Sequence, residues 1–266
     1  MRPVFCFIDD SRFELDVFSQ NIIPAGLGLE FVLGSTYEEV KAALGVRYPC
    51  LFVLDLYGRD PGLAEPEIPA LPELQSEVSL CGTLEHVYEG LDDYAGDKTN
   101  EYLKRLFHLS DGWRRLFYRT SRRAGQSIRY GLHNLIAVRR EYPAAAAVAY
   151  TRKSLIMDAV EILAAGVDGL DLKPDGPTDK EIRRVTVLAA SSLLAAWSNL
   201  VTKRFTNYLN GLIVLLLGTG LTADAAKLKR PDTMSDQARE LLGPADLDFL
   251  RTAVNWWEFT GKDWVL

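Results

Sequence analysis

Five polar side chains that could act together in one chemical site stand where short apolar runs of the sequence end. They are Asp9, Asp10, Asp55, Thr151 and Lys173. Three neighbouring carboxylates repel one another and are driven toward the protonated form unless a cation neutralises them. An all-oxygen ligand set without His or Cys favours Mg²⁺, whose shell is often completed by phosphate oxygens. These residue types therefore predict a site for a phosphoryl group.

The five side chains can take different chemical roles in such a site. An aspartate beside a metal ion can act as a nucleophile and form an aspartyl phosphate. The Lys173 ammonium would neutralise one phosphoryl oxygen, and the Thr151 hydroxyl would donate a hydrogen bond to another. Stabilisation would be mostly electrostatic. The prediction holds only if the fold gathers residues that are far apart in the sequence.

The elements that must position them alternate between strand and helix. Apolar and β-branched runs predict strands at 4–8, 29–34, 51–56, 144–150 and 169–173, and helical spacing predicts helices at 12–23, 37–47, 126–141 and 155–165. This alternation is typical of an α/β fold with right-handed crossovers and one parallel sheet. In a doubly wound parallel sheet the carboxyl ends of all strands share one edge, where ligands bind. We therefore expect a five-stranded, doubly wound sheet with the five side chains on that edge.

Three regions are predicted along the 266 residues. Residues 1–57 and 126–190 form the α/β domain, 58–125 form a helical insertion, and 191–266 form a helical C-terminal extension. Within the insertion, helices are predicted at 74–91 and 101–119. One long helix is predicted over 178–217, and two short helices at 235–242 and 246–257, on either side of Gly243 and Pro244.

Charge is divided unevenly along the insertion. Residues 60–101 hold eleven acidic side chains against Lys98, and residues 102–142 hold ten Lys or Arg against Asp111 and Glu141. Arginines interleaved with aromatic residues over 113–142 could bind single-stranded nucleic acid. The favoured interpretation is that these arginines face the acidic half of the insertion.

Composition restricts the remaining function classes. The formal net charge of −6 argues against a broad affinity for nucleic acid or anionic membranes. Three widely spaced cysteines without a CxxC pair favour reduced thiols. The longest apolar run, 211–217, is shorter than the roughly 20 residues of a membrane span. We expect a cytoplasmic protein that does not cross a membrane.

Four segments carry a resemblance to a known family: FIDDS (7–11), LFVLDLYG (51–58), AAVAYTRKS (146–154) and AAGVDGLDLKP (164–174). Together they resemble the receiver domain of two-component response regulators, which has a flavodoxin-like sheet. The resemblance implies that Asp55 is the phosphoacceptor and that Mg²⁺ is held by Asp10, Asp55 and the Tyr57 carbonyl. It further implies that Asp9 assists the metal through water, that Thr151 is the switch hydroxyl, and that Lys173 is the lysine of the family motif.

The resemblance also implies partners. The phosphoryl donor would be a sensor histidine kinase or a phosphotransfer protein, and the output would be contact with a downstream protein. The apolar stripe of helix 178–217 favours core packing, with homodimerisation as a second hypothesis. Because the insertion follows Asp55 directly, we expect it to be a regulatory or partner-binding module. The chain would not be an enzyme, except that it assists its own phosphorylation and dephosphorylation.

Two alternatives stay open. Arg152 follows Thr151 where the family usually has a small residue, and Leu170 stands where an aromatic switch residue is common. Both favour a pseudo-receiver that acts as an interaction scaffold without phosphorylation. The other alternative is a nucleic-acid-binding regulator that uses residues 113–142.

Overall fold

The computed structural model describes residues 2–60, 62–152 and 156–262. The described chain divides into two compact units: Met1–Tyr57 with Arg129–Leu266, and Gly58–Ile128. The end of the quoted motif at 153–154 and the first residue of the helix predicted at 155–165 lie outside the described residues.

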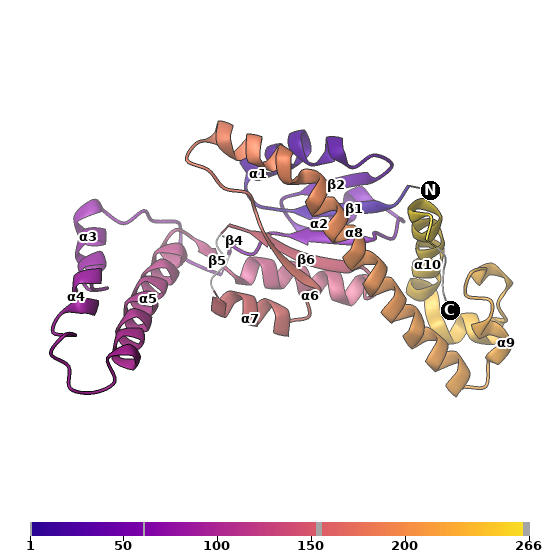
Figure 1. Cartoon of the computed structure of the whole chain (residues 1–266). Helices are drawn as coiled ribbons and strands as arrows, with labels where there is room; N and C mark the ends of the chain where they lie inside the picture. The colour runs from indigo at the N-terminus through magenta and orange to yellow at the C-terminus, as the bar shows by residue number, and fades with distance from the viewer. Residues whose placement is uncertain (1, 61, 153–155, 263–266) are drawn as a thin grey trace. The chain divides into compact units, whose positions relative to one another are not determined.

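The larger unit is built on a parallel sheet, as predicted (Figure 1). Its described strands are β1 (Val4–Ile8), β2 (Glu30–Gly34), β3 (Leu51–Leu54), β6 (Ala146–Thr151) and β7 (Gly169–Leu172), in the order β2-β1-β3-β6-β7. All four neighbouring pairs are parallel. Every residue of β1, β3 and β6 is buried, which explains why these strands are continuous apolar runs in the sequence.

Helices cover both faces of this sheet. They are α1 (Arg12–Asn21), α2 (Tyr37–Leu44), α6 (Arg129–Glu141), α7 (Ile156–Ala164) and α8 (Asp179–Gly218). Helix α1 packs beside α8, and α2 packs beside α6. The hydroxyls of Ser11, Thr36 and Thr178 cap α1, α2 and α8 by accepting a bond from the amide three residues later. The helix predicted from residue 126 begins at Arg129, because Gln126 and Ser127 form a short strand instead.

Helix α8 is the long orange helix of Figure 1. Its buried side chains recur at three- and four-residue spacing and include Leu194, Trp197, Val201 and Phe205. By length and composition, α8 is the one described helix that could cross a membrane, with a hydropathy of 1.5 in a window of which 28% is buried. A core helix that packs on a sheet passes the same test, so this is weak evidence for a span.

The C-terminal helix α10 (Asp236–Thr260) packs against the amino ends of the strands. Gly243 has φ +76° inside it and Pro244 follows, which is where the sequence predicts the boundary between two helices. Trp256 lies 6.0 Å from Phe5 of β1, and Phe249 lies 6.2 Å from Tyr48, which precedes β3 (ring centroids). The helix therefore covers the edge of the sheet opposite the carboxyl ends.

The insertion unit contains three described helices: α3 (Leu71–Ser79), α4 (Leu84–Tyr88) and α5 (Lys98–Arg123). The prediction of one helix over 74–91 is wrong, because the chain turns at Gly82, which has φ +82°. Two short antiparallel strands, β4 (Gly58–Arg59) and β5 (Gln126–Ser127), join the ends of the insertion.

Charged side chains of the insertion unit pair with one another, and the favoured interpretation is confirmed only in part. Arg123 bonds to Glu73 at 2.5 Å and lies 3.2 Å from Glu67, both in the acidic half of the insertion. Arg114 and Arg115 instead contact Asp111 of their own helix at 2.7 Å. The arginines are therefore divided between the acidic half and partners within α5.

The packing of α10 predicts a large effect of Trp256→Ala on stability. Trp256 is fully buried against Phe5 and Phe205, so its loss should lower the free energy of unfolding by about 3–5 kcal/mol. Leu241→Ala on the same helix is the control, because Leu241 is 40% exposed. Urea unfolding measures both. Equal effects of the two substitutions would show that α10 is not part of the core.

Candidate functional site

The acidic pocket lies at the carboxyl ends of β1 and β3. Asp9 and Asp10 follow β1 and Asp55 follows β3, and one carboxylate oxygen from each lies within 4.8 Å of the others. Asp9 and Asp55 are buried and Asp10 is partly exposed. Backbone hydrogen bonds hold two of these residues at the end of the sheet. The Asp9 amide donates to the Gly34 carbonyl of β2 at 3.1 Å, and the Asp55 amide donates to the Ile8 carbonyl of β1 at 2.9 Å.

Lys173 enters this pocket from the end of β7. Its Nζ donates to Asp9 Oδ2 at 2.5 Å and to Asp55 Oδ1 at 2.7 Å. Burial alone would lower the lysine pKa, but the carboxylates of Asp55 and Asp9 outweigh it and raise the pKa above its usual value. The ammonium therefore stays charged.

Thr151 ends β6 next to Lys173. It is fully buried, and its carbonyl accepts the Lys173 amide at 3.1 Å. Tyr57, two residues after Asp55, is also buried. The structure thus gathers Asp9, Asp10, Asp55 and Lys173 and sets Thr151 at the adjoining strand end, while the roles of these residues and of the Tyr57 carbonyl stay predictions.

The electrostatics of the pocket fit a divalent cation. Burial and the Asp55 carboxylate raise the pKa of Asp9 to about 7, although Lys173 and the Ser11 amide, 2.9 Å from Asp9 Oδ1, act in the other direction. Three carboxylates against one ammonium leave excess negative charge. The donor atoms are all oxygen, which suits Mg²⁺. Asp9, Asp10 and Asp55 are the residues that would hold it.

Several contacts around the pocket were not predicted from the sequence. Tyr130, in the first turn of α6, donates its hydroxyl to the Ser35 carbonyl at 2.6 Å. Burial raises its pKa, and the carboxylates of Asp10, Asp9 and Asp55 raise it further. Gly131 follows, and a Cβ there would lie 2.8 Å from the carbonyl oxygens of Asp55 and Leu56. In the sequence, the one signal that points to Tyr130 is its position just after the insertion.

Arg152 joins helix α1 to the segment that follows β7. Its guanidinium pairs with Glu14 of α1, and its Nε donates to the Pro174 carbonyl at 3.0 Å. The same Nε lies 3.6 Å from Asp175 Oδ1, so three partners hold the Arg152 side chain in place.

Aromatic rings connect the pocket to α8. Lys173 Nζ lies 5.9 Å from the centre of the Tyr150 ring, and Tyr150 meets Trp197 of α8 edge to face at 5.4 Å. Trp197 Nε1 donates to Asp171 of β7 at 2.7 Å. The rings therefore provide a contact between the pocket and α8.

The strand order now decides the fold. When only the five strands of this sheet are numbered, in chain order, the order β2-β1-β3-β6-β7 becomes 2-1-3-4-5, which is the flavodoxin-like arrangement. The three aspartates lie at the carboxyl ends of the first and third of these strands. The chain has a flavodoxin-like fold. In sequence, the sheet carries two additions, the insertion unit after β3 and the helices that follow α8.

Comparison with solved structures finds similarity to receiver domains at low sequence identity. A response regulator receiver domain protein from Methanospirillum hungatei is 14% identical, with a TM-score of 0.34, over 70% of this chain and 94% of that chain. The signal receiver domain of a LuxO repressor protein from Vibrio parahaemolyticus is 11% identical, with a TM-score of 0.39, over 77% and 93%. The receiver domain of NtrX from Brucella abortus is 15% identical, with a TM-score of 0.33, over 70% and 97%. No family model and no curated protein matches the sequence.

The raised pKa of Asp9 predicts a loss of stability with increasing pH when Mg²⁺ is absent. Asp9 is protonated in the folded state below pH 7 and ionised in the unfolded state above pH 4, so unfolding releases its proton. The free energy of unfolding should therefore fall as the pH rises from 6 to 8. Urea unfolding in the presence of EDTA measures the change.

Asp9→Asn is the matched variant, because an amide does not titrate. Its free energy of unfolding should lack this part of the pH dependence. An identical pH profile for the wild type and Asp9→Asn would show that Asp9 does not titrate in this range.

Proposed function

We propose that this chain is a two-component response regulator that accepts a phosphoryl group on Asp55. The observation that carries the proposal is the Lys173 ammonium, held between Asp9 and Asp55 at the edge of a receiver sheet. Bound Mg²⁺ would neutralise the aspartates and hold a phosphoryl oxygen. Lys173 would contact a second oxygen and Thr151 a third.

The chemistry would be a single phosphoryl transfer. A carboxylate oxygen of Asp55 forms a bond to phosphorus while the P–N bond of a phosphohistidine breaks. The departing imidazole nitrogen keeps the electron pair of that bond and takes up a proton. The donor would be a sensor histidine kinase or a phosphotransfer protein. The chain's own contribution is to orient the nucleophile and to balance charge.

Phosphorylation would be signalled to other proteins through contacts made by the larger unit. Val187 and Leu188 near the start of α8, and Val214 near its end, are more than half exposed, so either end of this helix offers apolar side chains to a downstream protein or to a second copy. Light scattering at two protein concentrations distinguishes these two partners.

The site assignment predicts that Asp55→Asn abolishes labelling. Wild-type protein incubated with Mg²⁺ and acetyl phosphate should gain the mass of one phosphoryl group, and Asp55→Asn should gain none. Asp16→Asn, an exposed aspartate of α1, is the control and should be labelled like the wild type. Mass spectrometry of the intact protein measures the gain.

Two outcomes would contradict the proposal. Labelling that survives in Asp55→Asn would place the phosphoacceptor elsewhere. A wild type that neither gains the phosphoryl group nor binds beryllofluoride with Mg²⁺ would favour the pseudo-receiver scaffold, in which Arg152 stays between Glu14 and Pro174 and limits donor access. Salt-dependent binding to single-stranded RNA would favour the nucleic-acid alternative.

The ring contacts predict that a phosphoryl group in the acidic pocket changes the surroundings of Trp197. A phosphoryl group on Asp55 would draw Lys173 toward it and change the environment of the Tyr150 and Trp197 rings. In protein containing fluorotryptophan, beryllofluoride with Mg²⁺ should shift the Trp197 fluorine resonance, whereas that of Trp113 in the insertion unit stays unchanged. Tyr150→Leu should remove the shift. An unshifted Trp197 resonance at saturating beryllofluoride would exclude this route.

A further inference from the structure

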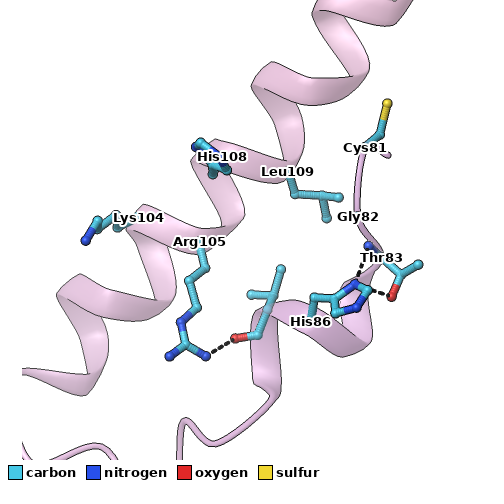
Figure 2. Close-up of a pocket in the computed structure, with 9 residues that line it drawn as sticks. Cys81, Gly82, Thr83, His86, Lys104, Arg105, His108 and Leu109 are labelled. Atoms are coloured by element: carbon cyan, nitrogen blue, oxygen red, sulfur yellow. Dashed lines mark hydrogen bonds between the residues drawn. The ribbon is translucent and has the colours of Figure 1, made fainter. Parts of the chain in front are cut away.

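A cavity of about 340 Å³ lies within the insertion unit, between α5 and the segment that runs from the end of α3 into α4 (Figure 2). This volume falls in the range of roughly 300–1,000 Å³ that is usual for small-molecule sites. Its described lining comes from two stretches of the chain: residues 81–83 with His86 and Val87, and Lys104, Arg105, His108 and Leu109 of α5.

Two glycines shape the cavity. Gly82 has no side chain to fill it, and a Cβ at this position would lie 3.7 Å from Leu109 Cδ1. Gly112 of α5 lets the helix approach the backbone of Cys81, because a Cβ there would lie 3.2 Å from the Cys81 carbonyl oxygen. Val87 is buried, and Leu109 extends from α5 toward residues 81–83 (Figure 2). One part of the lining is therefore apolar.

Arg105 holds the two sides of the cavity together. It donates to the carbonyl oxygens of Glu89 at 2.6 Å and Val87 at 3.4 Å, and to Glu101 Oε1 at 2.8 Å. With these partners its guanidinium is already engaged in joining α4 to α5. We therefore assign Arg105 a structural role.

The other polar groups of the lining leave hydrogen-bond donors available. The Lys104 side chain is 79% exposed, and its ammonium lies 3.8 Å from the Glu101 carboxylate, a weak pairing. His86 Nδ1 accepts the Thr83 amide at 3.1 Å, so the neutral ring carries its proton on Nε2. His108 adds a second imidazole. None of the described lining residues is an Asp or a Glu.

We propose that this cavity binds a small organic anion. Val87 and Leu109 would contact an apolar body, while Lys104 and His108, four residues apart on α5, would contact a carboxylate at the edge of the cavity. The charge of the lining selects against a cationic ligand, and the volume restricts the ligand to a small molecule. The site belongs to the insertion unit and does not depend on phosphorylation of Asp55.

Three probes with the same apolar body and different head groups test the charge selectivity: octanoate, octanamide and octylammonium. Titrated into the full chain, octanoate should bind about tenfold more tightly than octylammonium, as expected for one favourable charge contact. Amide chemical-shift changes in the NMR spectrum should map to residues 81–87 and 104–109.

Variants separate the head-group contact from the cavity itself. Lys104→Gln should weaken octanoate binding about fivefold and leave octanamide binding unchanged, since only the anion uses the ammonium. Leu109→Phe should weaken all three probes by occupying the cavity. Arg122→Gln is the control, because Arg122 is exposed on α5 and outside the lining. Circular dichroism verifies that each variant keeps its helices.

Several outcomes would overturn the proposal. Octylammonium binding as tightly as octanoate, shifts that map outside the lining, or binding that is unaffected by Leu109→Phe would each do so. No binding of any probe would also overturn it. Concentration-dependent self-association that perturbs the same amides would instead assign the groove to a second copy of this chain.

Discussion

The buried ammonium of Lys173 is the interaction on which the rest of the site depends. It contacts Asp9 and Asp55, which are 164 and 118 residues away in the chain. Removing two carboxylates from water is unfavourable unless opposite charge and hydrogen bonds replace the solvent. One ammonium neutralises the charge of three aspartates only in part. The burial that brings the carboxylates together therefore also favours the binding of a further cation. The proposed affinity for a metal ion would therefore have the same origin as the cost of folding.

The sheet was predictable from the sequence because its strands are buried on both faces. Runs such as VFCFI and LFVL have no polar side chain, and their short length and their β-branched and aromatic residues are typical of buried parallel strands. The strand ends then placed Asp9, Asp10, Asp55, Thr151 and Lys173 on one edge without any knowledge of side-chain positions. Periodicity and topology together were sufficient for this part.

The insertion was predicted less well because local signals compete there. A helical pattern over 74–91 contains Gly82, and the pattern alone does not distinguish a tolerated glycine from a turn with positive φ. Two side-chain pairings around the acidic pocket could not be predicted from the sequence for a different reason. Arg152 with Glu14 and Tyr130 with Ser35 join residues 138 and 95 positions apart, and nothing local in the sequence specifies such partners.

The pairing of β3 with β6 has a consequence for synthesis of the chain. Leu51 pairs with Ala146, and the whole insertion lies between them. During translation, β1, β2 and β3 leave the ribosome well before their fourth neighbour exists, so β3 exposes an unpaired apolar edge while more than ninety further residues are added. A nascent chain in this state is a natural client for chaperones, and slowing of elongation between codons 58 and 145 would lengthen that exposure.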